Sequence, residues 1–152
     1  MQELKYLIQN ETLIIVDPEL DICIRAPFDL VDQRVTFYPS GKIKSKVYYR
    51  RKELHGPSSF YSQEGVLLAK TWFCAGLKQG KAYRYYNSGK IYALLRFKDG
   101  VEQGTHKYFY DSGQIKTVLS YSKGKLQKTA TLYRPNHEIK MEMHFENELS
   151  TQ

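Results

Sequence analysis

An all-β fold, built as one elongated, twisted antiparallel sheet of tandem 24-residue β-hairpin repeats, is what the sequence predicts. The first observation is composition: 14% of the residues are aromatic, and the chain contains 13 Tyr, a residue type that favours half-buried strands. The second is a regular period, and the third is an alternation of apolar and polar residues within each unit. The period is clearest in four glycines: Gly41, Gly65, Gly89 and Gly113.

Residues 1–34 do not follow this period. Three short strand-like runs are visible there, at 4–8, 12–16 and 20–24. A turn around Pro18 separates two of them. The ends of repeat arrays are commonly atypical because they cap an exposed edge. We therefore expect residues 1–34 to form a β-rich N-terminal cap that packs on the first hairpin.

Five hairpin units are predicted over residues 35–149, and each reads as two strands joined by a tight turn. In the third unit, Asn87-Ser88-Gly89 separates two apolar runs. This is the chemistry of a three-residue loop that ends in a glycine with a left-handed backbone. Such a loop places Tyr85 and Ile91 on the same face of the sheet. Residues 150–152 are expected to fray beyond the last unit.

The second strand of each unit alternates with a period of two. In the third unit this predicts that Ile91, Ala93, Leu95 and Phe97 share one face. Strict alternation indicates one buried face and one wetter face, and the small residues that recur at the position of Ala93 leave room for a neighbouring ring. Because each hairpin alone is marginal, stacking of neighbours is expected to supply the core.

One motif of the third unit carries a family resemblance. From Tyr85 it reads Tyr-Tyr-Asn-Ser-Gly-Lys-Ile, followed by an aromatic residue and then by Lys-Asp-Gly and a later Gly. This pattern resembles the MORN-repeat family, and in particular its bacterial variant branch, some of whose members are antitoxin-like. The resemblance covers about Val35 to Leu149 and implies MORN-like hairpins. The fifth unit departs from it, with His137 where the turn glycine stands elsewhere.

Charge is distributed unevenly along the chain, whose formal net charge is +7. Residues 35–134 contain 19 Lys and Arg against five acids, whereas residues 1–34 contain three basic residues against seven acids. Alternation predicts a basic group on the outer face of the second strands: Lys42, Lys44, Lys46, Lys70, Lys90, Arg96 and Lys116. Such a field attracts an acidic protein or an anionic membrane surface, although lysines on a sheet face also discourage aggregation.

The same outer face is predicted to carry an apolar patch: Trp72, Tyr48, Tyr92, Leu68, Leu94 and Val118. An apolar patch with a basic rim is typical of a protein-interaction surface. The alternative is permanent cover, either by the N-terminal cap or by another protomer. Nucleic acid is not favoured as a partner, because the most regular aromatic residues, such as Phe73 and Phe97, are predicted to face inward.

Catalytic, metal-binding and targeting signals are not visible in the sequence. Nucleophile-elbow, zinc-protease and phosphate-loop motifs are missing, and neither Cys23 nor Cys74 has further metal ligands at short spacing. No cofactor is implied. With neither a signal peptide nor a long apolar run, we expect a cytoplasmic protein, with attachment to a membrane surface as an option.

The function predicted from these features is that of a non-catalytic protein-binding or scaffold module. The six apolar residues of the patch would anchor another protein, and the seven basic residues would steer it. One alternative is peripheral binding to an anionic membrane surface through the lysine-rich face. Another, implied by the resemblance alone, is antitoxin-like neutralisation of a toxin protein. Homo-oligomerisation is compatible with each of these.

Overall fold

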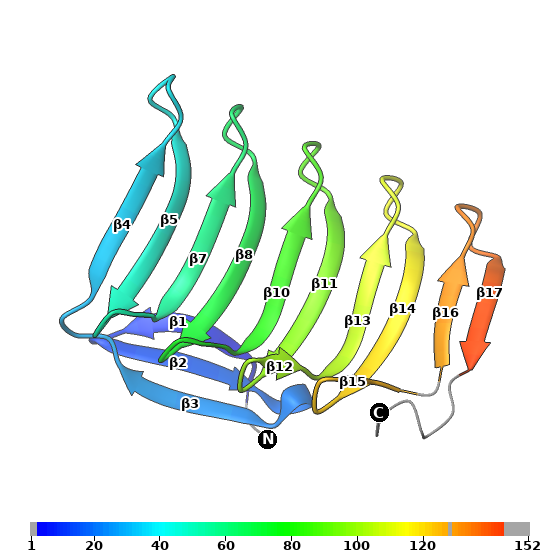
Figure 1. Ribbon diagram of the computed structural model, residues 1–152, viewed down its shortest axis with the longest axis horizontal. Helices are drawn as coiled ribbons and strands as arrows, with labels where there is room; N and C mark the ends of the chain where they lie inside the picture. The colour runs from blue at the N-terminus through cyan, green and yellow to red at the C-terminus, as the bar shows by residue number, and fades with distance from the viewer. Residues whose placement is uncertain (1–2, 128, 145–152) are drawn as a thin grey trace.

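The computed structural model describes residues 3–127 and 129–144, and in these residues the molecule is all-β (Figure 1). The one helical element among them is a short 3-10 turn, η1 (Pro18–Leu20). The strands form two sheets, a small N-terminal one and a long antiparallel one. The predicted fold class is therefore confirmed. The expected tail, 150–152, and the end of the fifth unit lie outside the described residues.

The N-terminal sheet has the order β1-β2-β3 and consists of β1 (Lys5–Gln9), β2 (Thr12–Asp17) and β3 (Ile22–Pro27). The long sheet consists of hairpins in chain order: β4 (Asp32–Phe37) with β5 (Ile43–Arg50), β7 (Gly56–Tyr61) with β8 (Leu67–Cys74), β10 (Gly80–Tyr85) with β11 (Ile91–Lys98), β13 (Gly104–Phe109) with β14 (Ile115–Ser122), and β16 (Thr129–Tyr133) with β17 (Ile139–His144). Two-residue strands pair with the ends of β5, β8, β11 and β14: β6 (Glu53–Leu54), β9 (Leu77–Lys78), β12 (Val101–Glu102) and β15 (Lys125–Leu126).

The turns at the hairpin tips have the geometry that the sequence predicts. In the third hairpin the Tyr86 amide donates to the Lys90 carbonyl at 2.8 Å, and the Gly89 amide donates to the Tyr86 carbonyl at 2.9 Å. These two bonds enclose a three-residue loop. Gly89 has a φ of 90°, in the left-handed region that costs a residue with a Cβ about 1–2 kcal/mol. His137 adopts the equivalent conformation in the fifth turn, with a φ of 71°.

A β-bulge interrupts the alternation in each hairpin. In the third hairpin Arg84 pairs with Ala93 and Tyr85 pairs with Ile91, so Tyr92 is an extra, unpaired residue. Tyr85 and Ile91 share a face, as predicted, but this is the face opposite to Ala93. The predicted alternation is therefore wrong at Ile91, because one inserted residue reverses the side to which the strand points.

Two rows of paired residues cross all five hairpins and define the faces of the long sheet. One row passes through Ala93 and Tyr108. The face of the sheet toward which these side chains point is called the open face. The adjacent row passes through Tyr83, Leu94 and Lys107. The face toward which the side chains of this second row point is called the covered face, because the N-terminal sheet packs against it.

Neighbouring hairpins are joined by few ladder pairs. Strands β8 and β10, for example, pair only at Lys70 with Tyr83 and at Ala69 with Arg84. At the tips a tyrosine hydroxyl bridges the gap instead, since the Tyr86 hydroxyl donates to a carbonyl of the next hairpin, that of Phe109, at 2.7 Å. The hydroxyls of the tyrosines at the same position in the first and fourth hairpins make the same bond. The spacing between hairpins is thus fixed by side chains as well as by the backbone.

The N-terminal sheet lies across the base of the hairpins, with its strands running across theirs (Figure 1). Its contact with the long sheet contains the main hydrophobic core, which consists of Leu13, Ile15, Leu20, Ile22 and Trp72. The predicted alternative that the N-terminal segment covers the apolar patch therefore holds for Trp72 and Tyr48, which pack against Tyr6 and Phe28. The cover extends beyond the first hairpin, because Phe28 packs against Tyr48 of the first hairpin and Glu19 pairs with Arg96 of the third.

Gly80 allows this close approach at the third hairpin. Its φ is 82°, and a Cβ at this position would overlap the Tyr6 ring, with Cε2 only 2.6 Å away. Gly56 and Gly104 hold the same position in the neighbouring hairpins and face Phe28 and Leu20. The glycines at the start of β7, β10 and β13 therefore serve the docking of the N-terminal sheet.

Candidate functional site

Four of the predicted partner anchors lie on the covered face: Trp72, Tyr48, Leu94 and Val118. Trp72 is 8% exposed, and its ring meets the Tyr6 ring edge-on at 5.8 Å. The Tyr48 ring lies 5.5 Å from that of Phe28. The prediction that Trp72 and Tyr48 stand free on an outer face is therefore wrong. Both hold the N-terminal sheet, whose placement no periodicity in residues 1–34 could indicate.

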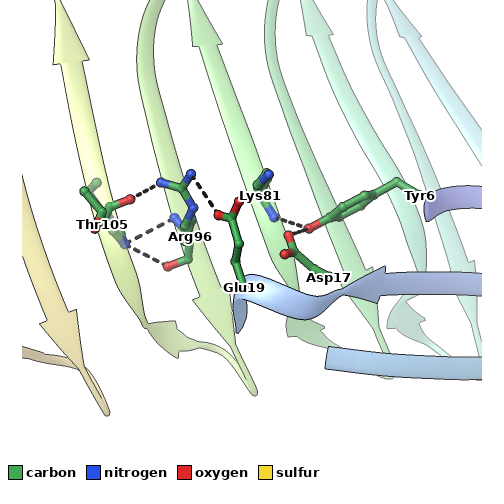
Figure 2. A network of polar contacts seen from close by, with 7 residues as sticks. Tyr6, Asp17, Glu19, Lys81, Arg96 and Thr105 are labelled. Atoms are coloured by element: carbon green, nitrogen blue, oxygen red, sulfur yellow. Dashed lines mark hydrogen bonds and ion pairs between the residues drawn. The ribbon is translucent and has the colours of Figure 1, made fainter. Parts of the chain in front are cut away.

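Arg96 was predicted as an exposed steering residue but is only 9% exposed, so that prediction is also wrong. Its guanidinium donates to the Thr105 carbonyl, and its Nη2 lies 3.5 Å from Glu19 Oε2 (Figure 2). A buried guanidinium is costly unless it is paired, so these contacts fix η1 on β11. Lys46 and Lys70 also belong to the covered face by register, and Lys70 Nζ lies 5.4 Å from the Trp72 ring.

A second polar contact joins the N-terminal sheet to the third hairpin (Figure 2). The Tyr6 hydroxyl donates to Asp17 Oδ2 at 2.5 Å and accepts a hydrogen bond from the Lys81 amide at 2.9 Å. Burial, together with the bond to the Asp17 carboxylate, raises the pKa of the Tyr6 phenol above its usual value. Tyr6 therefore stays a neutral donor and orients the N-terminal sheet.

The other predicted strand residues occupy the bulge position: Lys44, Leu68, Tyr92 and Lys116. Lys44 Nζ lies 5.8 Å from the Tyr38 ring, and the Tyr92 ring lies 5.4 Å from the Tyr86 ring. The prediction that they share a face with Trp72 is wrong, because the bulge turns them toward the open face. Lys42 and Lys90 directly follow the turn glycines and are exposed at the hairpin tips.

An aromatic hollow opens on this face between the third and fourth hairpins. Its volume is about 320 Å³, and its lining consists of Tyr86, Tyr92, Tyr108, Phe109, Lys116, Thr117 and Leu119. Only Tyr92 and Lys116 were predicted as binding residues. A signal for Tyr86 exists in the sequence, since a tyrosine precedes the turn in the first, third and fourth units at the repeat period.

The open face is predominantly basic. By register and bulge position its basic residues are Arg34, Lys44, Lys78, Arg84, Lys116 and Lys140. Among the described residues, the acids placed there by strand pairing are Asp32 and Glu102. Asp32 is already paired with Arg34, Oδ2 to Nε, at 3.2 Å. The field over this face therefore favours an approaching anion.

His106 is the buried titratable group of this face. Its Nε2 lies 2.8 Å from the Arg96 carbonyl oxygen, and its ring lies 4.7 Å from that of Tyr121. Burial lowers the pKa of the imidazole below its ordinary value of 6.5. The hydrogen bond to the Arg96 backbone raises the pKa, but the effect of burial is larger. His106 is therefore a neutral structural residue near pH 7.

Binding is the chemistry that the residues of the hollow can supply. The hollow offers aromatic surfaces and one ammonium group, with no carboxylate or imidazole among the residues that line it. Across residues 3–127 and 129–144, no group of three or more His, Cys, Asp and Glu side chains could hold a metal ion. No helix in that part of the chain is long and apolar enough to cross a membrane.

Two matches among the solved structures come from streptococci. The match to the Glycosylation Associate Protein (Gap123) complex from Streptococcus agalactiae has 19% identity, covers 93% of this chain and 26% of that one, and has a TM-score of 0.43. The match to accessory secretory protein 1, 2 and 3 in Streptococcus pneumoniae has 12% identity, covers 78% of this chain and 22% of that one, and has a TM-score of 0.36. The chain thus spans about a quarter of each matched chain.

Sequence comparison gives a family match. No curated protein matches the chain. The family model described as MORN repeat variant matches residues 33–51, 78–99 and 102–123. These segments fall on the first, third and fourth hairpins, and the other two hairpins have the same strand pairing, bulge and turn. The chain is therefore similar to the MORN repeat variant in these three hairpins.

Proposed function

We propose that the chain is a non-catalytic protein-binding scaffold of the bacterial cytoplasm, and that its partner docks on the open face. The observation that supports this most is the asymmetry of the long sheet. The N-terminal sheet occupies the covered face, whereas Tyr92, Met141 and Met143 are 38, 49 and 41% exposed. A rigid surface with aromatic residues and basic neighbours suits recognition of another protein.

A pair of matched variants tests this proposal. A partner would be captured from the native host, purified, and titrated against the wild type, a Tyr92→Glu/Lys116→Glu variant and a Lys125→Glu control. Lys125 is exposed and pairs with Ser122, away from the hollow. We expect the double variant to weaken the Kd by at least about a hundredfold and the control by less than about twofold. Equal affinity of all three proteins would show that the partner docks elsewhere.

Peripheral binding to an anionic membrane is the second candidate. It is favoured by the exposure of four lysines at or near the hairpin tips: Lys42, Lys44, Lys90 and Lys116. Each lysine near an anionic surface contributes about 1 kcal/mol, and salt screens the attraction. Co-sedimentation with anionic and neutral liposomes at physiological salt separates the candidates. Binding that requires anionic lipid and persists at that salt would favour the membrane.

A more specific form of protein binding is the neutralisation of a toxin protein. The family match supports the repeat array, and only the resemblance to the variant branch suggests this role. It requires a tight one-to-one complex with a toxin whose activity disappears on binding. Co-expression with neighbouring gene products, followed by native mass spectrometry, would reveal such a complex. A partner that stays active when bound would argue for scaffolding instead.

A further inference from the structure

The aromatic hollow has the shape and the charge to select a partner segment of particular chemistry. We propose that it binds a protein segment in which one large apolar side chain is flanked by Asp or Glu residues. This inference rests on the proposed protein-binding function and specifies the partner. The apolar side chain would enter the hollow, and the flanking carboxylates would meet the basic residues around it.

The apolar part of the proposal follows from the lining of the hollow. Tyr86, Tyr92 and Tyr108 contribute aromatic surface from two hairpins, and Leu119 adds an aliphatic group. At about 320 Å³ the hollow is at the lower end of the range for ligand pockets, which fits one bulky side chain better than a cofactor. A buried aromatic or aliphatic anchor in a pocket is also what dominates the affinity of protein interfaces.

The framework of the hollow is held in place by contacts within the array. The Tyr86 hydroxyl donates to the Phe109 carbonyl at 2.7 Å, so the two hairpins that form the walls are tied together at this point. Tyr92 packs on Tyr86 with a ring separation of 5.4 Å. Because the walls are fixed before a partner arrives, little conformational entropy is lost on binding.

The acidic part of the proposal follows from charge complementarity. Lys116 lines the hollow and is exposed, and Lys44, Lys78 and Arg84 lie on the same face. Strand pairing places two acids on that face: Asp32 is paired with Arg34 in the first hairpin, and Glu102 lies on β12, where it pairs with Phe97 at the far end of β11 from the hollow. Carboxylates beside the anchor would thus be attracted, whereas lysines would be repelled.

Selection from a displayed library of random 12-residue peptides on the wild-type protein, with counter-selection on Tyr92→Glu/Lys116→Glu, tests the proposal. Enriched peptides would be synthesised, and their affinities measured by fluorescence anisotropy at low and physiological salt. We expect acidic peptides with one aromatic or large aliphatic residue. Their Kd should weaken by at least about tenfold with Lys116→Glu and with added salt, and by less than about twofold with the Lys125→Glu control.

Three other outcomes would overturn the proposal in different ways. If the enriched peptides were neutral or basic and their binding depended on Tyr92, acidic residues would not be required, and the protein-binding function would still stand. Peptides whose affinity is unchanged in the Tyr92→Glu/Lys116→Glu variant would show that the hollow is not the site. Absence of enriched peptides, together with Lys116-dependent binding to phosphatidylserine vesicles, would replace both this proposal and the protein-binding function by a membrane role. Circular dichroism of each variant would verify that it is folded.

Discussion

His137 introduces backbone strain into the turn of the fifth hairpin. It occupies the turn position at which the other four hairpins have glycine, and its φ of 71° is in the left-handed region. Its ring lies 5.4 Å from that of Tyr133, a contact that offsets part of the backbone strain. The hydrogen bonds of the turn are the same as those of the glycine turns, so the strain does not change the shape of the loop.

His137→Gly should therefore stabilise the protein. Removing the Cβ relieves about 1–2 kcal/mol of strain in the left-handed backbone. Glycine has more conformational freedom in the unfolded chain, which destabilises the folded protein by about 0.5–1 kcal/mol. We expect a net gain of up to about 1 kcal/mol in the free energy of unfolding, measured by urea denaturation. Gly89→His, the reverse change, should destabilise. A loss of stability with His137→Gly would mean that the contact with Tyr133 outweighs the strain.

His106 makes stability depend on pH. Its pKa is lowered in the folded protein because the imidazole is buried, whereas the unfolded chain has the ordinary value of 6.5. Below about pH 6.5 the unfolded state gains a proton at this site that the folded state does not yet accept. The free energy of unfolding should therefore fall as the pH drops from about 6.5 towards the lower folded pKa.

Unfolding by urea at a series of pH values, for the wild type and for His106→Asn, would measure this effect. The variant removes the titrating group, so its stability should depend less on pH in this window than that of the wild type. The difference between the two curves isolates His106 from the other histidines and from the carboxylates. Parallel curves would show that the imidazole takes up a proton equally in both states.

The docking of the N-terminal sheet on the array is the main event at the scale of elements. It places β2 and β3 against β8, with Trp72 at the centre of the contact. Tyr6, Glu19 and Arg96 add polar contacts beside this core (Figure 2). The sheet therefore has both an apolar driving force and groups that fix its orientation.

Trp72→Ala should weaken this docking strongly. Truncation of a buried tryptophan removes its transfer free energy and leaves a cavity, which together cost about 3–5 kcal/mol. Leu77→Ala is a suitable control, because Leu77 is 47% exposed and its loss should change stability by less than about 1 kcal/mol. Thermal and urea unfolding would give both values. Similar values for the two variants would mean that the N-terminal sheet contributes little to stability.

Prediction from sequence succeeded for the elements whose signal is local and periodic. The turn at Asn87-Ser88-Gly89 and the pairing of Tyr85 with Ile91 depend on residues close in the chain, and both are confirmed. The bulge at Tyr92 leaves no separate signal in the sequence. An extra residue reverses the face to which the following side chains point, but it does not change the amino-acid composition of the strand. The burial of Trp72 depends on contacts with residues about fifty to sixty positions away, which no repeat pattern specifies.

At the scale of the whole molecule, the array is supported unevenly along its length. The N-terminal sheet lies under the first three hairpins (Figure 1) and contacts them through residues such as Phe28 and Leu13. Leu20 of η1 also faces Gly104 at the start of β13. The fifth hairpin lies beyond this cover. Ile139, Met141 and Met143 of β17 are 56, 49 and 41% exposed. In a repeat array each unit is stabilised by its neighbours, so a hairpin with one neighbour and no cover should open most readily.

Hydrogen exchange followed by mass spectrometry would show this gradient. Amides of β16 and β17 should exchange at least about tenfold faster than those of β8 and β10, because opening the fifth hairpin exposes less apolar surface. In Trp72→Ala the N-terminal sheet loses its central contact, so exchange in β8 and β10 should rise towards that of the fifth hairpin. Uniform protection along the wild-type array would mean instead that all five hairpins open together, and that the array behaves as one cooperative unit whose stability the N-terminal sheet sets as a whole.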